Sequence, residues 1–142
     1  MGKVKDILRV KGNSVYSVEP SIMVIEAIEL MCEKNIGGLL IVDDGKLEGI
    51  FTERDYARKL ILKGKSSKST PISELMTKNP FTITPENSIE DCMNMMTDKH
   101  IRHLPVMQGG KLEGLISIGD VVKHIIEEQK SIIEHLENYI SR

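Results

Sequence analysis

Hydrophobic and polar positions follow the same pattern twice along the chain. In each copy a short apolar segment, Val15 to Val18 or Phe81 to Ile83, comes shortly before a proline and predicts a strand. Apolar residues then recur at spacings of three and four, which predicts a helix with one buried face. Two more apolar strands and a second helix follow. Each copy therefore predicts the element order β-α-β-β-α.

The two copies align without a gap when residues 16–61 are laid over residues 81–126. Gly45 to Gly49 match Gly110 to Gly114 residue for residue, which indicates an internal duplication. Both stretches begin at a glycine turn between two apolar strands, and this predicts a hairpin. Because one copy is too small to cover its own apolar face, we expect an α/β (α+β) fold of two repeats packed with pseudo-twofold symmetry.

Polar and proline-containing stretches set the expected boundaries. We assign residues 4–64 to the first repeat, 65–71 to a linker, 72–127 to the second repeat and 128–142 to a C-terminal helical extension. Residues 4–8 are similar to the segment that opens the second repeat. We therefore expect them to open the first.

The most informative motif is Gly-apolar-apolar-Thr/Ser-x-x-Asp, which occurs as Gly49–Asp55 and as Gly114–Asp120. A strand ends at the hydroxyl residue and a helix begins there, so unpaired backbone N–H groups and the positive end of the helix dipole meet at one place. The aspartate can accept hydrogen bonds from sugar hydroxyls, and the Thr or Ser can contact a phosphate. The alternative is a capping box, in which the same two side chains only cap the helix.

The two copies differ around this motif. Arg102 and His103 offer a forked cation and a titratable donor, whereas the first copy has Gly37 and Gly38 at the same positions. Arg54 lies in the first turn of a helix, where a cation opposes the dipole, and a bound phosphate would offset that cost. We therefore expect two unequal binding sites.

These features resemble the CBS domain, the cystathionine-β-synthase-type module, and residues 4 to 127 resemble a stand-alone tandem pair. The resemblance rests on Thr52-Glu53-Arg54-Asp55, Ser117-Ile118-Gly119-Asp120, Arg102-His103-Leu104-Pro105-Val106, Glu19-Pro20 and Thr84-Pro85. In that family such pairs bind AMP, ADP, ATP, NAD or S-adenosylmethionine in the clefts between the repeats. They also often dimerise.

The resemblance implies that the aspartates hold ribose hydroxyls, that hydroxyl, arginine and histidine side chains surround phosphate or sugar, and that apolar residues contact the base. Expected at site 2 are Thr84, Ile89, Arg102, His103, Leu104, Pro105, Ser117, Gly119 and Asp120. Expected at site 1 are Val18, Glu19, Val24, Gly37, Gly38, Thr52, Arg54 and Asp55. Because the carboxylate of Glu19 would repel phosphate, we expect a nucleotide first at site 2 and a second or different adenosine ligand at site 1.

Composition excludes several other functions. A formal net charge of -2 and a pI of about 6.1 argue against nucleic acid as a ligand. No apolar run is long enough to span a membrane and no signal peptide is evident, so we expect a cytoplasmic protein. We find no catalytic triad, paired carboxylates or phosphate loop, and no histidine with the partners of a zinc site. We therefore expect no enzyme activity, no catalytic cofactor and no metal.

The C-terminal extension carries an apolar stripe. Its positions alternate spacings of four and three, as in a short coiled coil, and they are Val122, Ile126, Gln129, Ile133, Leu136 and Ile140. The stripe predicts either a homodimer or tetramer or a helix that folds back onto its own repeats.

The sequence as a whole predicts a regulatory sensor that binds AMP, or else NAD or ATP, and signals to an unknown protein partner through a conformational change. The alternative is a constitutive scaffold with vestigial clefts that oligomerises through its last helix.

Overall fold

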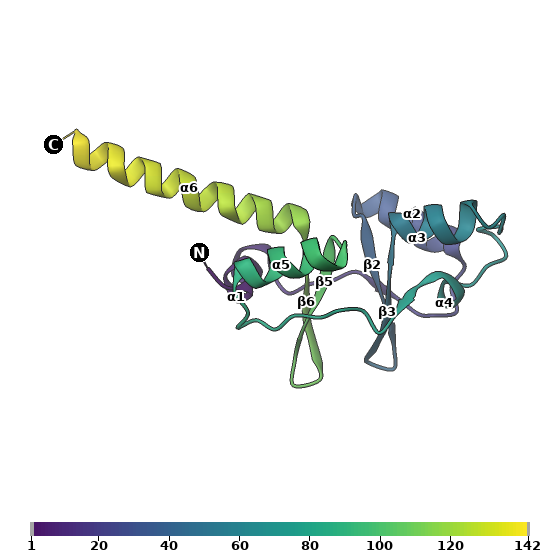
Figure 1. Cartoon of the computed structure of the whole chain (residues 1–142). Helices are drawn as coiled ribbons and strands as arrows, with labels where there is room; N and C mark the ends of the chain where they lie inside the picture. Colours follow the sequence, from purple (N-terminus) through teal and green to yellow (C-terminus); the bar gives the residue numbers. More distant parts are fainter. Residues whose placement is uncertain (1, 142) are drawn as a thin grey trace. The chain divides into compact units, whose positions relative to one another are not determined.

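The computed structural model describes residues 2–141, which divide into two compact units. Unit 1 comprises Met1–Asn13 and Thr82–Arg142, and unit 2 comprises Ser14–Phe81. Helices and strands are mixed in both, which confirms the predicted α+β class (Figure 1). The first residues of the chain thus belong to the unit that contains the second copy of the repeat.

Unit 2 is built on a four-stranded sheet of order β1-β2-β3-β4. β1 pairs parallel with β2, and the other neighbours are antiparallel. Its elements are β1 (Ser17–Val18), α2 (Val24–Lys34), β2 (Gly38–Asp43), β3 (Lys46–Thr52), α3 (Glu53–Asp55), η1 (Tyr56–Ile61), α4 (Ile72–Leu75) and β4 (Thr77–Lys78). A core that includes Leu39, Phe51 and Ile72, each fully buried, joins the sheet to the helices.

Unit 1 is built on one hairpin covered by helices (Figure 1). Its elements are α1 (Val4–Lys11), α5 (Ile89–Lys99), β5 (His103–Gln108), β6 (Lys111–Ser117) and α6 (Ile118–Ile140). The strand predicted over Phe81–Ile83 is wrong in extent, because only Ile83 forms a bridge, parallel to Val106. The helices α1, α5 and α6 all contribute side chains to the core of this unit.

The predicted hairpin turns are confirmed in both units. Asp44 and Gly45 have φ angles of 50° and 76°, and Gly109 and Gly110 have φ angles of 59° and 78°. Positive φ at both central residues is the backbone that a two-residue hairpin needs, and glycine adopts it without strain.

The second helix of the first copy departs from regular α geometry. It begins as α3 and continues as the π-helix η1, in which the N–H of Leu62 donates to the carbonyl oxygen of Ala57 at 3.2 Å. The matching helix of the second copy, α6, is a continuous α-helix of 23 residues. The helices that follow Asp55 and Asp120 therefore differ, and these are the places where the sequence predicts two unequal binding sites. π turns occur frequently at functional sites.

A segment from outside the hairpin lies directly against a strand glycine in each unit. In unit 1 a Cβ placed on Gly114 would come within 2.7 Å of Leu8 Cδ2 in α1. In unit 2 a Cβ on Gly49 would come within 2.9 Å of Met76 Sδ and 2.7 Å of the carbonyl oxygen of Thr77. Both copies have glycine at this position because a larger side chain would collide with the segment that covers the strand.

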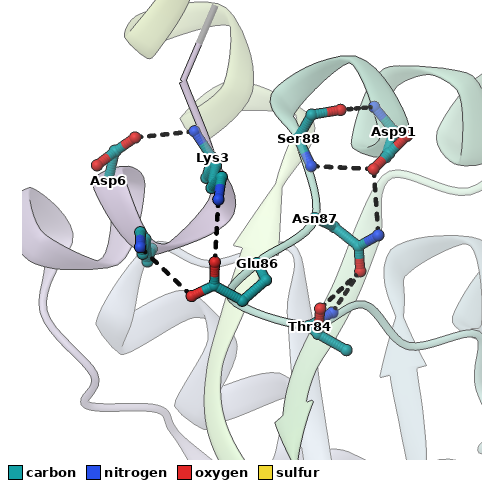
Figure 2. A network of polar contacts seen from close by, with 8 residues as sticks. Lys3, Asp6, Thr84, Glu86, Asn87, Ser88 and Asp91 are labelled. Carbon is teal, nitrogen blue, oxygen red and sulfur yellow. Dashed lines mark hydrogen bonds and ion pairs between the residues drawn. The ribbon is translucent and has the colours of Figure 1, made fainter.

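Two ion pairs also hold the N-terminal segment in unit 1. Lys3 Nζ lies 3.1 Å from the carboxylate of Glu86 (Figure 2), and Lys5 Nζ lies 3.4 Å from the same carboxylate. Hydrogen bonds from the two ammonium groups lower the pKa of Glu86 below its ordinary value. The segment that was expected to open the first repeat is thus fixed beside the second copy.

We expect Gly49→Ala to lower the free energy of unfolding by about 1–3 kcal/mol, because the new methyl group meets backbone that cannot move away. Gly114→Ala should cost less, since its obstacle is the end of a leucine side chain. Urea unfolding measures both effects.

Gly119→Ala is the control for this pair. Its Cβ would meet only Ser117 Oγ at 3.6 Å, so a helical alanine there should stabilise the protein by roughly 0.5–1 kcal/mol. Equal losses for the Gly49 and Gly114 variants would contradict the proposed role of the backbone contact.

Candidate functional site

Each unit contains one strand–helix junction with the same backbone geometry. In unit 2, Thr52 pairs with Gly38, and the next N–H, of Glu53, donates to the carbonyl oxygen of Gly37 at 3.2 Å. We call this the Asp55 junction.

The corresponding Asp120 junction lies in unit 1. Ser117 pairs with His103, and the N–H of Ile118 donates to the carbonyl oxygen of Arg102 at 2.8 Å. The duplication therefore reproduces the junction down to individual hydrogen bonds.

Both junctions contain the capping box that the sequence left open as an alternative. Thr52 and Ser117 are the N-cap residues of α3 and α6, and each accepts a hydrogen bond from the N–H of the aspartate three residues later. The aspartate Oδ2 accepts the N-cap N–H in return, at 2.9 Å for Asp55 and 2.8 Å for Asp120. One oxygen of each carboxylate is thus used to cap its own helix.

The second oxygen of Asp55 is also occupied. Asp55 Oδ1 accepts a hydrogen bond from Thr77 Oγ1 at 3.1 Å and forms an ion pair with Lys59 Nζ at 3.0 Å. Lys59 also donates to the carbonyl oxygen of Leu75 at 3.1 Å. Because only 8% of the Asp55 side chain is exposed, this carboxylate is buried with partners on both oxygens.

Asp120 is arranged differently. Its Oδ2 carries both the cap and an ion pair with Lys11 Nζ at 2.6 Å, and Lys11 also donates to the carbonyl oxygen of Leu115 at 2.7 Å. Within residues 2–141, Asp120 Oδ1 has no hydrogen-bond or ion-pair partner. With 22% of its side chain exposed, Asp120 keeps an accessible acceptor that Asp55 lacks.

The charge state of Asp120 follows from these contacts. Partial burial raises its pKa, but the hydrogen bond and charge of Lys11 and the N–H of Ser117 lower it by more, so the pKa lies below its ordinary value of 3.8. Asp120 is therefore ionised at neutral pH.

The other residues expected at site 2 fall into two groups. Arg102, His103 and Gly119 lie at the Asp120 junction, where Arg102 and Gly119 are exposed and His103 is half-buried. Ile89 and Leu104 are fully buried in the core of unit 1, and Pro105 is buried in β5. The polar members therefore gather at the junction while the apolar members pack inside the unit.

Thr84 does not join this group within unit 1. Ile83 pairs with Val106, three residues from His103, so Thr84 lies about 10 Å or more along β5 from the junction. Its backbone N–H and its hydroxyl both donate to Asn87 Oδ1 at 2.9 Å (Figure 2). Thr84 thus stabilises the loop before α5.

The residues expected at site 1 divide in the same way. Gly37, Gly38, Thr52, Arg54 and Asp55 lie at the Asp55 junction, whereas Val18 pairs with Ile41 further along β2 and places the exposed Glu19 beyond it. Val24 is fully buried in the core of unit 2.

Sequence reasoning missed three polar residues at the junctions, namely Lys11, Lys59 and Thr77. The contact of Lys59 with Asp55 could have been predicted from the sequence, because Lys59 follows Asp55 by one helical turn. The contact of Lys11 with Asp120 could not, because it forms only when α1 packs on the hairpin of the second copy.

We also looked for a pocket, a metal site and a membrane-spanning helix outside the two junctions. A surface groove of about 820 Å³ in unit 2, lined by residues such as Pro20, Glu74 and Lys78, contains none of the expected site residues. Among residues 2–141 no group of three His, Cys, Asp or Glu side chains is arranged to hold a metal ion. No helix in that range has the length and apolar character needed to cross a membrane.

The CBS domain family model matches residues 4–62 and 72–127. The chain therefore belongs to the CBS domain family and contains a tandem pair of these domains, which confirms the resemblance seen in the sequence.

Relatives and solved structures agree with this assignment. The chain is 38% identical over 146 residues to the CBS domain-containing protein CBSX3, mitochondrial, of Arabidopsis thaliana, covering 96% of this chain and 71% of that one. A putative signal-transduction protein with CBS domains from Burkholderia ambifaria has a TM-score of 0.86 and 48% identity, covering 89% of this chain and 96% of that one. The structure of CBSX2 in complex with AMP has a TM-score of 0.75 and 27% identity, covering 91% and 99%.

We expect Lys11→Met to raise the pKa of Asp120 and to lower the free energy of unfolding at pH 7 by up to about 1 kcal/mol, since the pair is partly exposed. Because the folded pKa lies below 3.8, this contribution is complete above that pH and is lost as the pH falls through the folded pKa. The difference between the variant and the wild type should therefore shrink in acid. Urea unfolding across pH and a carboxyl NMR titration measure the two effects.

Lys5→Met on the same helix is the matched control. Its partner Glu86 is 57% exposed, so the loss of stability should be smaller. An unchanged pKa of Asp120 in Lys11→Met would show that Lys11 does not set the charge state of this carboxylate.

Proposed function

We propose that the protein is a regulatory module that binds an adenosine nucleotide at the Asp120 junction and catalyses no reaction. One observation carries the proposal: Asp120 Oδ1 is an accessible carboxylate oxygen, without a partner in residues 2–141, at the first turn of a long helix. An ionised carboxylate in this position is suited to accept hydrogen bonds from the neighbouring hydroxyls of a ribose.

Positive charge at the same junction is suited to the phosphate. The ammonium of Lys11 lies 2.6 Å from Asp120, and the exposed Arg102 adjoins the backbone at the start of α6. The N-terminus of α6 adds its own partial positive charge. A ligand with a ribose and at least one phosphate is favoured, with AMP first and NAD or ATP next. The AMP complex of the related CBSX2 supports this ligand class.

The Asp55 junction is proposed as the weaker site. A ligand hydroxyl there would have to displace Thr77 or Lys59 from Asp55 Oδ1, and the displaced groups would need new partners. We therefore assign the first ligand to Asp120 and a second or different adenosine ligand to the Asp55 junction.

In this proposal the protein is cytoplasmic and forms a homodimer or tetramer. Its regulatory role is to signal to a protein partner whether the nucleotide is bound. A ligand can do this only if it binds two conformations with different affinity. The other function to consider is a constitutive scaffold, which the occupied state of Asp55 and the exposed end of α6 favour. Only the sensor should gain thermal stability from adenine nucleotides, because a ligand that binds the folded state stabilises it.

We expect AMP to bind the wild-type protein in titration calorimetry and Asp120→Asn to weaken that binding by about ten- to a hundredfold, through loss of a charge-assisted hydrogen bond. Asp55→Asn should instead cost more stability than affinity, because it removes a buried partner of Lys59. The titration is repeated with ADP, ATP and NAD.

Asp91→Asn is the matched control. Asp91 occupies the same capping-box position at the start of α5 but lies in none of the expected sites, so its loss should leave nucleotide affinity unchanged. The sensor proposal fails if none of these nucleotides binds, and the site assignment fails if Asp120→Asn binds AMP as tightly as the wild type.

A further inference from the structure

The C-terminal part of α6 is a helix with an apolar face that its own unit does not cover. The first turns pack on unit 1, where Val121 is fully buried and Ile125 contacts the core. From Gln129 to Ser141 every side chain is exposed. Figure 1 shows this half of α6, in yellow, continuing away from α1 and α5. The stripe therefore does not fold back onto unit 1, the unit to which α6 belongs.

The exposed residues form the stripe predicted from the sequence, and we call it the α6 stripe. Their exposed fractions are Val122 46%, Ile126 45%, Ile133 54%, Leu136 53% and Ile140 80%, with the polar Gln129 between them. Alternating steps of four and three average 3.5 residues per turn, the period of a seam that meets a second helix of the same kind. Ile132 and Tyr139, each just before a seam residue, widen the stripe on one side.

We propose that the α6 stripe pairs with the α6 stripe of a second copy of this chain in antiparallel orientation. The register that matches every seam position is centred at Ser131. It places Val122 opposite Ile140 of the second copy, Ile126 opposite Leu136, and Gln129 opposite Ile133. All six positions then face another seam position, and the polar Gln129 lies against the apolar Ile133 of the second copy.

The residues that flank the seam distinguish antiparallel from parallel pairing. In the antiparallel pair the residues on one flank are offset by two positions from the seam register, so Lys123 lies beside Glu137 of the second copy, and by symmetry this pair occurs twice. On the other flank Ile132 meets Ile132, and Ile125 meets Tyr139. A parallel pair would instead set Ile132 beside Glu137, an apolar side chain against a charge. Matching charges and matching apolar groups therefore both favour the antiparallel arrangement.

The charges on α6 are available for this pairing. Lys123 and Glu137 are exposed and form no ion pair with other residues in the range 2–141. Lys130 meets Lys130 at the centre of the register, but its Nζ lies 3.8 Å from Glu127 Oε1 of its own helix, which reduces the repulsion. The helix carries five carboxylates and two lysines, so an anionic lipid surface is a poor alternative partner.

Sedimentation velocity of the protein tests the inference, which does not rest on the proposed nucleotide site. Leu136→Asp should remove the self-association, because it places a charge in the seam of both copies. Lys123→Glu and Glu137→Lys should each weaken association by about tenfold, since each turns two attractive pairs into repulsive ones. The double variant Lys123→Glu with Glu137→Lys should restore it.

The restoration is specific for the proposed register. The two residues lie four turns apart on one helix, so they cannot rescue each other within a chain, and in a parallel pair they would not face each other. Glu134→Lys, the same charge change on the outer face of the helix, is the control and should leave association unchanged. A wild type that does not self-associate, a Leu136→Asp variant that still does, or a double variant without restoration would each overturn the proposal.

Discussion

The close contact between a strand glycine and a segment from elsewhere in the chain is the constraint on which both units depend. At Gly114 and Gly49 a methyl group would collide with Leu8 or with the backbone of Thr77, so the covering segment lies as near to the strand as an atom allows. The segment before the first copy covers the second copy, and the segment after the first copy covers the first. Neither copy, taken in sequence order, therefore contains all the residues that enclose its own core.

This arrangement explains why two identical motifs end in different chemistry. In unit 2 the covering helix α4 stops after four residues, and β4 then brings Thr77 to Asp55. In unit 1 the covering helix α1 continues for eight residues and ends with Lys11 at Asp120. One carboxylate is consequently buried with both oxygens used, and the other keeps an accessible oxygen beside a cation. Duplication preserved the backbone of the junction, while the covering segments changed which oxygens of its aspartate are accessible.

Local patterns in the sequence predicted local structure well. The duplication, the hairpin turns and the helix starts at Thr52 and Ser117 all depend on residues that are close together in the chain. The contacts that distinguish the two candidate sites depend instead on residues that are far apart in the chain. Lys11 meets Asp120 across more than a hundred residues, and no spacing in the sequence encodes that distance. Thr84 matched a family motif, yet its hydroxyl is engaged by Asn87, because an asparagine three residues later closes a local turn.

The position of α6 connects the two proposals physically. Its first turn includes Asp120, and the α6 stripe begins two residues later, so one continuous helix carries both surfaces. A helix of 23 residues is stiff, and a rotation of its first turn must rotate the stripe with it. Because Lys11 holds Asp120 from α1, a ligand that draws Lys11 towards its phosphate would change how the start of α6 is held against unit 1. Coupling by this route requires that the protein binds nucleotide with different affinity when α6 is paired and when it is unpaired. Thermodynamic linkage then requires that bound nucleotide changes the affinity of self-association by the same factor.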